Sequence, residues 1–151
     1  MKNKRFDFLK KDYVQGFPAY CGFKVERVGY SLFEARLNIG PDHKQQDGFA
    51  HAGLIATMAD HTAGYAAYTT VGEDFRILTI EFKINYFRPA KGPVIICRSR
   101  VINSGKRVIV SESEIFSAAD PTDRNTSENA EKLVSKAMVT LMTVPASRFP
   151  A

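Results

Sequence analysis

The segment from Ala52 to Tyr68 limits the possible folds of this chain more than any other feature. Nearly all of its side chains are small or apolar, and only Asp60 and His61 ionise readily near neutral pH. The segment predicts a helix over residues 51–69, and a helix with so few polar residues must be covered on nearly all sides. A curved sheet covers one side, so we expect a second subunit to cover part of the rest.

The residues around this helix predict an antiparallel sheet. Strands are expected over residues 23–28, 31–39, 76–87, 94–102, 107–117 and 132–144. In the clearest of them, one face carries Leu78, Ile80, Phe82, Ile84 and Tyr86, and the other carries Thr79, Glu81, Lys83 and Asn85. Short connections between the last four strands make neighbouring strands antiparallel. The fold class is therefore α+β, with a curved antiparallel sheet wrapped around one long central helix.

A short helix is expected before the sheet. Residues 3–14 place Phe6, Leu9 and Tyr13 on one face and basic residues on the opposite face. We interpret this segment as a helix docked on the edge of the domain. The alternative is a helix on a membrane surface, but its apolar stripe is too short to bind a membrane well alone. Glycine and proline within residues 16–22 then break the chain.

The composition fits one folded domain. The chain has 151 residues, of which 44% are hydrophobic and 25% charged, unlike a disordered protein. We expect a single domain over residues 1–151, with residues 1–19 as an N-terminal helical extension. The polar residues 118–130 predict a long hairpin loop.

Charge and cysteine content narrow the possible partners and compartment. Of the formal net charge of +5, a share of +3 lies within residues 1–12, where five Lys or Arg face two Asp. The nearly balanced remainder argues against a nucleic-acid partner, which needs basic residues gathered on one face. Cys21 and Cys97 show no metal-ligand spacing, and neither a signal peptide nor a membrane-spanning stretch is visible. We therefore expect reduced thiols, a cytoplasmic protein and no membrane partner.

Asp60 requires an explanation because it lies in an apolar segment. Desolvating a carboxylate costs several kcal/mol unless a partner compensates it. Asp60 therefore either pairs with a lysine or arginine or takes part in a reaction. The polar loop 41–50 leads directly into the helix. The loop and the helix that carries Asp60 together form the candidate site.

Two motifs resemble a known family. The run from His51 to Asp60 (HAGLIATMAD) resembles the HGG…D signature of hotdog-fold acyl-CoA thioesterases, especially the phenylacetic-acid-degradation (PaaI-like) type. The run from Thr79 to Gly92 (TIEFKINYFRPAKG) is similar to the strand and Pro-Ala turn that follow in that family. The resemblance covers residues 20–144. It implies a hotdog fold, hydrolysis of an acyl-CoA thioester, and a dimer or tetramer whose active sites lie between subunits.

The resemblance also implies roles for individual residues. Asp60 is the expected general base or nucleophile, and the backbone amide of Ala52 is the expected donor to the thioester carbonyl. Gln45 and Thr79 are expected to position water or the acid, and His51 to orient the site. Ala52 stands where the family usually has a glycine, but alanine also supplies a backbone N–H. Gln45 stands where an asparagine is common.

Further residues are expected to bind substrate or to be structural. Coenzyme A is a polyanion, and the expected substrate-binding residues are Gly53, Arg88, Lys91, Lys106 and Arg107. Each of the four basic residues lies at a strand end or turn, where solvation is the competing interpretation. We expect His61 to point away from Asp60, and His43 to be a loop residue.

Helix geometry predicts that the site is shared between chains. His51 and Asp60 are nine residues apart, which separates them by half a turn and about 13 Å along a helix. They cannot meet within one subunit. They can meet if the helix start of one chain faces Asp60 of another.

Two other functions on the same fold remain open. One is an acyl-CoA-binding module without catalysis, and the other is a hydratase or dehydratase, which needs an Asp/His pair in a different arrangement. The sequence contains neither a metal-ligand cluster nor a dinucleotide-binding glycine motif. We therefore expect no metal and no cofactor apart from the coenzyme A of the substrate.

Overall fold

The computed structural model describes residues 2–119 and 131–149. Its helices are α1 (Lys2–Tyr13), α2 (Gly16–Cys21) and α3 (Ala52–Tyr68), with short 3-10 turns η1 (Pro41–His43) and η2 (Ala146–Arg148). Its strands are β1 (Lys24–Gly29), β2 (Leu32–Asn38), β3 (Phe75–Tyr86), β4 (Val94–Ser104), β5 (Val108–Ala118) and β6 (Lys132–Pro145). The predicted polar loop 118–130 falls almost entirely outside the described residues.

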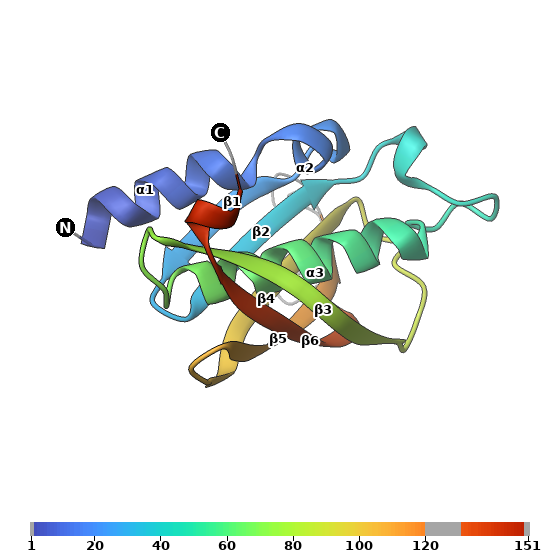
Figure 1. Ribbon diagram of the computed structural model, residues 1–151. Helices are drawn as coiled ribbons and strands as arrows, with labels where there is room; N and C mark the ends of the chain where they lie inside the picture. Colours follow the sequence, from blue (N-terminus) through green and yellow to red (C-terminus); the bar gives the residue numbers. More distant parts are fainter. Residues whose placement is uncertain (1, 120–130, 150–151) are drawn as a thin grey trace.

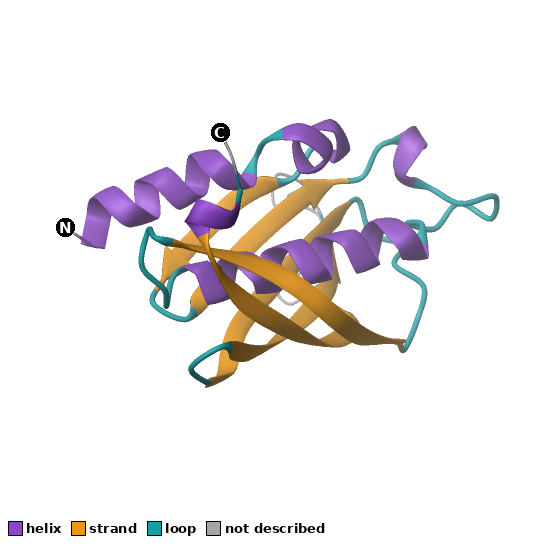
Figure 2. Ribbon diagram, viewed as in Figure 1, coloured by secondary structure: helices purple, strands orange, loops and turns teal. Residues whose placement is uncertain are grey.

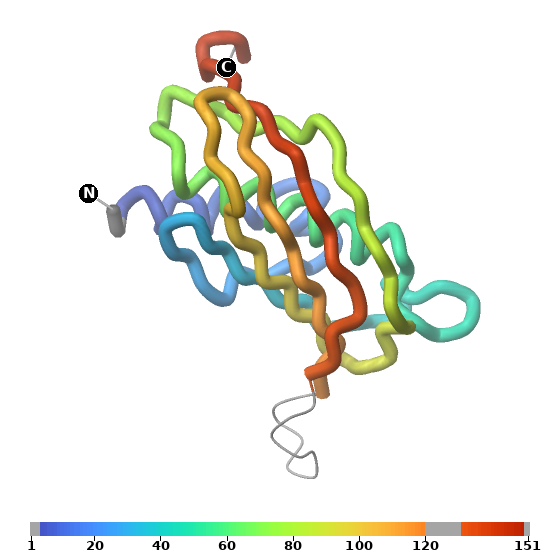
Figure 3. The backbone as a smooth tube through the Cα atoms, turned by 90° about the horizontal axis from the view of Figure 1, so that it is seen from below, coloured from blue at the N-terminus to red at the C-terminus, as the bar shows by residue number. Residues whose placement is uncertain are grey.

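The strands form one antiparallel sheet in the order β1-β2-β4-β5-β6-β3. The sheet curves around α3, which lies in its concave face and contacts β2 to β6 (Figure 1, Figure 2). β3 follows α3 in the chain but lies at the sheet edge, where β6 is its only partner among the described strands (Figure 3). The expected α+β hotdog architecture is confirmed.

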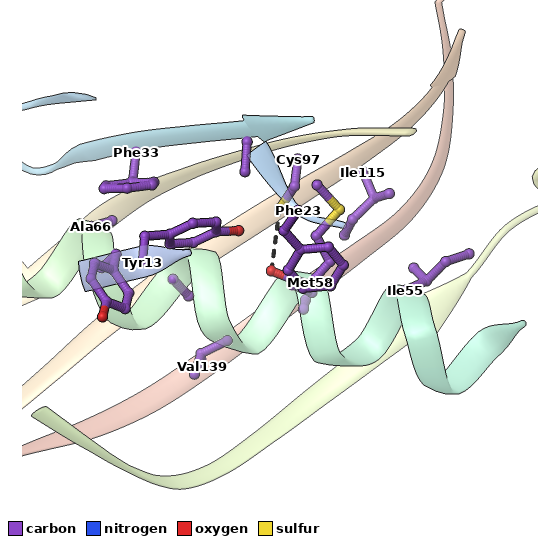
Figure 4. Packing of buried hydrophobic residues seen from close by; sticks show 14 of the residues in the cluster. Tyr13, Phe23, Phe33, Ile55, Met58, Ala66, Cys97, Ile115 and Val139 are labelled. Atoms are coloured by element: carbon purple, nitrogen blue, oxygen red, sulfur yellow. Dashed lines mark hydrogen bonds between the residues drawn. The ribbon is translucent and has the colours of Figure 1, made fainter. Parts of the chain in front are cut away.

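The N-terminal helices cover part of α3 that the sheet leaves open. Leu9 and Tyr13 on α1 are fully buried, as their spacing predicted. The Tyr13 ring stacks on Phe33 with 4.8 Å between ring centroids (Figure 4). Its hydroxyl lies 2.9 Å from Thr62 Oγ1 on α3. Some of the cover that we expected from a second subunit therefore comes from the same chain.

The predicted break over residues 16–22 is wrong in part, because six of these residues form α2. Pro18 is tolerated because it lies in the first turn, where its missing N–H has no helical partner. Gly22 ends the helix with a left-handed φ of 82°, which glycine adopts without strain. The glycines and the proline do separate α1 from β1, but they begin and end a short helix instead of forming a loop.

Buried hydroxyls tie the middle of α3 to the sheet. Ser113 Oγ on β5 donates to the carbonyl of Ala59 at 2.7 Å, and Ser99 Oγ on β4 lies 2.6 Å from Ser113 Oγ. Thr62 Oγ1 donates to the carbonyl of Met58 at 2.6 Å. The Ser113 bond attaches the turn of α3 that carries Asp60 to the sheet, and the Thr62 bond lies within α3 itself.

We expect the docking of α1 to contribute substantially to stability. Leu9→Ala should lower the free energy of unfolding by about 2–5 kcal/mol, because it leaves a cavity in the core. Phe8→Ala is the matched control: Phe8 is 52% exposed on the same helix and should change stability by no more than about 0.5 kcal/mol. Urea unfolding at one protein concentration measures the change in the free energy of unfolding for both variants. Equal effects of the two variants would contradict the docked position of α1.

Candidate active site

A bulge in β3 brings Thr79 to Asp60. Thr79 pairs with Leu141, but Glu81 pairs with Thr140, so β3 has one residue more than β6 at this point. The side chains before and after the extra residue Ile80 therefore do not follow one alternation. Thr79 turns toward α3, where its Oγ1 donates to Asp60 Oδ1 at 2.8 Å.

This arrangement corrects two predictions. Leu78 does not share a face with Phe82 and Tyr86, because it pairs with Met142 on the exposed side of the sheet. Thr79 was expected on the strand face of Glu81 and Lys83, opposite Phe82 and Tyr86. It contacts Asp60 of its own chain instead. Simple period-two counting fails here because the bulge is not visible in the residue pattern.

Asp60 is partly buried and forms no salt bridge with a described residue. Burial raises the pKa of the Asp60 carboxyl, while the hydrogen bond from Thr79 and the nearby His61 lower it. The ion-pair alternative therefore finds no support in the described part of the chain. Thr79 occupies Oδ1, which leaves Oδ2 available to a ligand or water.

His61 points away from the carboxylate, as expected. Its Nε2 lies 2.9 Å from the carbonyl oxygen of Tyr13, and its ring packs against Tyr13 and Tyr65. Burial lowers the pKa of His61, which favours the neutral ring. His61 therefore helps to dock α1 on α3.

The start of α3 leaves one backbone N–H free. His51 caps the helix, since its Nδ1 accepts from Gly53 N at 2.9 Å and its carbonyl accepts from Leu54 N and Ile55 N. Among the described residues, the N–H of Ala52 finds no acceptor in the first turn. A free N–H at the positive end of a helix is suited to bind a partly negative oxygen. The predicted positions of His51, as an orienting residue, and of Ala52 fit this geometry.

Tyr86 belongs to the same site, although the sequence interpretation assigned it only to an apolar strand face. Its hydroxyl donates to the carbonyl of Ala52 at 2.7 Å. The peptide that carries this carbonyl also carries the Gly53 N–H, which donates to His51 Nδ1. One peptide plane thus links Tyr86 to His51. The only sequence signal for this role is a phenol where the strand meets the Arg-Pro turn.

A pocket of about 390 Å³ opens beside the free amide, and Gln45, Ala52, Tyr86 and Arg88 contribute to its wall. The side chain of Gln45 folds back into its own loop, where Oε1 accepts from the backbone N–H groups of Asp47 and Phe49. Gln45 therefore lies beside the start of α3. Its side-chain oxygen is already used by the loop.

The basic residues divide into two groups. Arg88 also lines a neighbouring pocket of about 480 Å³ together with Lys91 and Lys132. Lys106 and Arg107 lie in the β4–β5 turn, at the opposite end of the sheet (Figure 1). One chain cannot bring all four predicted basic residues to one ligand.

Ala52 and Asp60 do not meet within one chain. They are eight residues apart on α3, which corresponds to about 12 Å along the axis. One group of candidate residues lies at the start of α3 and comprises Gln45, His51, Ala52, Gly53 and Arg88. Asp60 and Thr79 form a second cluster about two turns further along the helix.

Residues 47–122 match the model of the thioesterase superfamily. The chain belongs to this superfamily. A candidate esterase from Halobacterium salinarum is 31% identical over 131 residues, which cover 81% of this chain and 85% of that protein. The acyl-coenzyme A thioesterase THEM4 of Xenopus laevis is 34% identical over 104 residues, which cover 67% of this chain and 44% of THEM4.

Solved structures agree with this assignment. A thioesterase family protein from Silicibacter pomeroyi superposes with a TM-score of 0.84 at 25% identity, covering 93% of this chain and 99% of that one. A thioesterase from Haemophilus influenzae shares the fold, with a TM-score of 0.77 at 20% identity over 92% and 90% of the two chains. The protein is therefore an enzyme of the thioester hydrolase class. None of the described helices of this thioesterase is long and apolar enough to cross a membrane.

Thr79→Val should raise the pKa of Asp60 further, because it removes the hydroxyl that stabilises the ionised carboxylate. Titration of the Asp60 side-chain carbon by NMR measures this directly. Thr140→Val is the matched control, since its hydroxyl donates to Glu81 on the other side of the bulge and should leave Asp60 unchanged. A pKa of Asp60 that falls or stays constant in Thr79→Val would refute the assigned contact.

Proposed function

We propose that the enzyme hydrolyses the thioester of a small, medium or aryl acyl-CoA, releasing the free acid and coenzyme A. The observation that carries the proposal is the free Ala52 amide beside a pocket, at a helix start. It is supported by the similarity to THEM4, which is named an acyl-coenzyme A thioesterase. The resemblance of the His51–Asp60 run to PaaI-like enzymes favours the same substrate class.

The Ala52 N–H is proposed to bind the carbonyl oxygen of the thioester. Negative charge develops on this oxygen when the carbonyl carbon is attacked, and an already oriented donor stabilises that charge. The dipole of α3 adds to the effect. Tyr86 and His51 hold the adjoining peptide in place, so the donor keeps its orientation.

Asp60 is proposed to start the reaction in one of two ways. As a general base, it takes a proton from water, the hydroxide attacks the carbonyl carbon, and the C–S bond breaks as the thiolate takes up a proton. As a nucleophile, its oxygen attacks the carbonyl carbon, the C–S bond breaks, and the coenzyme A thiolate leaves and takes up a proton; water then hydrolyses the resulting anhydride to the free acid and the Asp60 carboxylate. Both routes need the ionised carboxylate. Partial burial makes that carboxylate more reactive by raising its pKa.

A second copy of the chain is proposed to bring Asp60 to the Ala52 amide. β3 runs antiparallel to α3, because Thr79 contacts Asp60 while Tyr86 contacts Ala52. Its outer edge is unpaired in the described chain and carries exposed apolar side chains. Two copies of β3 that pair antiparallel about a two-fold axis near Phe82 would set Tyr86 of one against Thr79 of the other. That register places each helix start beside the other chain's carboxylate.

Coenzyme A is proposed to lie on the side of Arg88 and Lys91, whose pockets adjoin the Ala52 amide. Gly53 borders the same helix start. Lys106 and Arg107 can reach this ligand only from another subunit. The reaction as written needs no cofactor besides the coenzyme A of the substrate. We also propose a cytoplasmic location, consistent with Cys21 and Cys97 as free thiols.

Asp60→Asn should lower kcat at least about a hundredfold, because it removes the base or nucleophile and keeps the shape of the side chain. Release of free thiol from a panel of acyl-CoA esters measures this loss and ranks the acyl groups. Asp7→Asn is the matched control, since Asp7 lies exposed on α1. A loss below tenfold in Asp60→Asn with the fold intact would favour an acyl-CoA-binding module instead.

A further inference from the structure

A second pocket touches the start of α3 on the side away from Ala52. It has a volume of about 390 Å³, within the size range of small-molecule sites, and lies between α2, η1 and α3. Phe17 and Tyr20 form its α2 wall, and Gly53 and Thr57 contribute to its α3 wall. The mechanism proposed above gives this pocket no role.

Two histidines among the residues that line this pocket carry their ring proton on Nε2. His51 Nδ1 accepts from Gly53 N and His43 Nδ1 accepts from Gly40 N, each at 2.9 Å. A neutral ring whose Nδ1 accepts carries its proton on Nε2. Both histidines line the pocket, and no described residue accepts from either Nε2. The pocket is therefore equipped to donate to an oxygen acceptor.

The remaining wall favours a flat or apolar ligand without net charge. The rings of Phe17 and Tyr20 stack with 6.5 Å between centroids and a 17° interplanar angle, yet they are 60% and 87% exposed. Asp42 also lines the pocket and would repel a carboxylate, and its lining includes neither lysine nor arginine. Thr57 donates its hydroxyl proton to the Gly53 carbonyl, so its oxygen can only accept a hydrogen bond from a ligand in the pocket.

The two sides of the helix start differ in charge. Arg88 borders the pocket beside Ala52, and that side continues to Lys91 and Lys132. None of these three forms a salt bridge with a described acid. The phosphates of coenzyme A match this basic side, so the acyl group leaves the thioester toward the other side.

We infer that the acyl group binds in the pocket of Phe17, Tyr20, His43 and His51, and that the pocket selects uncharged acyl groups carrying a hydroxyl or oxo oxygen. The inference rests on the proposed function, because it needs the thioester at the Ala52 amide. It assigns α2 and η1 to substrate recognition. Lys132 becomes a phosphate-binding residue on the opposite side.

The test compares kcat/KM for 3-hydroxyhexanoyl and hexanoyl thioesters, each carried on coenzyme A and on N-acetylcysteamine, which lacks the phosphates. His43→Asn keeps an acceptor for Gly40 N and removes the Nε2 donor. It should lower the preference for the hydroxylated acyl group about 2- to 10-fold, the range for one hydrogen bond, on both carriers. Tyr20→Ala should lower kcat/KM for both acyl groups about 3- to 10-fold on both carriers.

Two further variants complete the design. Lys132→Ala should lower kcat/KM only for the coenzyme A esters. Phe8 is an exposed aromatic residue on α1, so Phe8→Ala should leave kcat/KM unchanged for all the thioesters. Unchanged acyl preference in His43→Asn together with unchanged kcat/KM in Tyr20→Ala, or changes confined to coenzyme A esters, would overturn the inference. Asp60→Asn keeps the two proposals distinguishable: full activity in that variant refutes the catalytic role, whatever the pocket variants do.

Discussion

The need to cover α3 organises the whole molecule. The helix has almost no polar face, and the curved sheet, α1 and α2 bury most of it. What they leave open is a strip that includes Gly53, Thr57 and Asp60, bordered by β3 on one flank. The carboxylate proposed for catalysis lies on this strip, where the fold permits access. The second copy proposed above would cover this strip and pair with the outer edge of β3, which has no partner among the described strands.

The candidate site depends on two local departures from regular structure, the bulge in β3 and the start of α3. The bulge at Ile80 turns Thr79 toward α3, and its hydroxyl then offsets part of the desolvation of Asp60. His51 accepts from the N–H groups of Gly53, Leu54 and Ile55, whereas the Ala52 N–H has no acceptor in the described part of the chain. The bulge adjusts the pKa of the Asp60 carboxyl, and the helix start leaves the Ala52 N–H as a hydrogen-bond donor. Chemistry on a thioester needs both groups, and α3 separates them by about 12 Å.

The sequence predicted the parts of this structure that follow from periodicity and motif. The long helix, all six strands and the burial of Leu9 and Tyr13 follow from the spacing of apolar residues. The bulge does not, because an inserted residue changes which face a side chain occupies without changing composition. The roles of Tyr86 and of the α2 pocket were also missed, since they arise from contacts between segments distant in the chain. The predicted shared site is still a prediction.

Mixing two inactive variants tests that shared site most directly. Ala52→Pro removes the proposed donor but keeps the helix, because proline suits the first helical position and His51 is already extended (φ −64°, ψ 134°). Asp60→Asn removes the carboxylate. If each site combines both chains, refolding an equal mixture should restore about a quarter of wild-type activity, since about half the dimers are mixed and each has one intact site. A mixture no more active than its two parents would contradict the account.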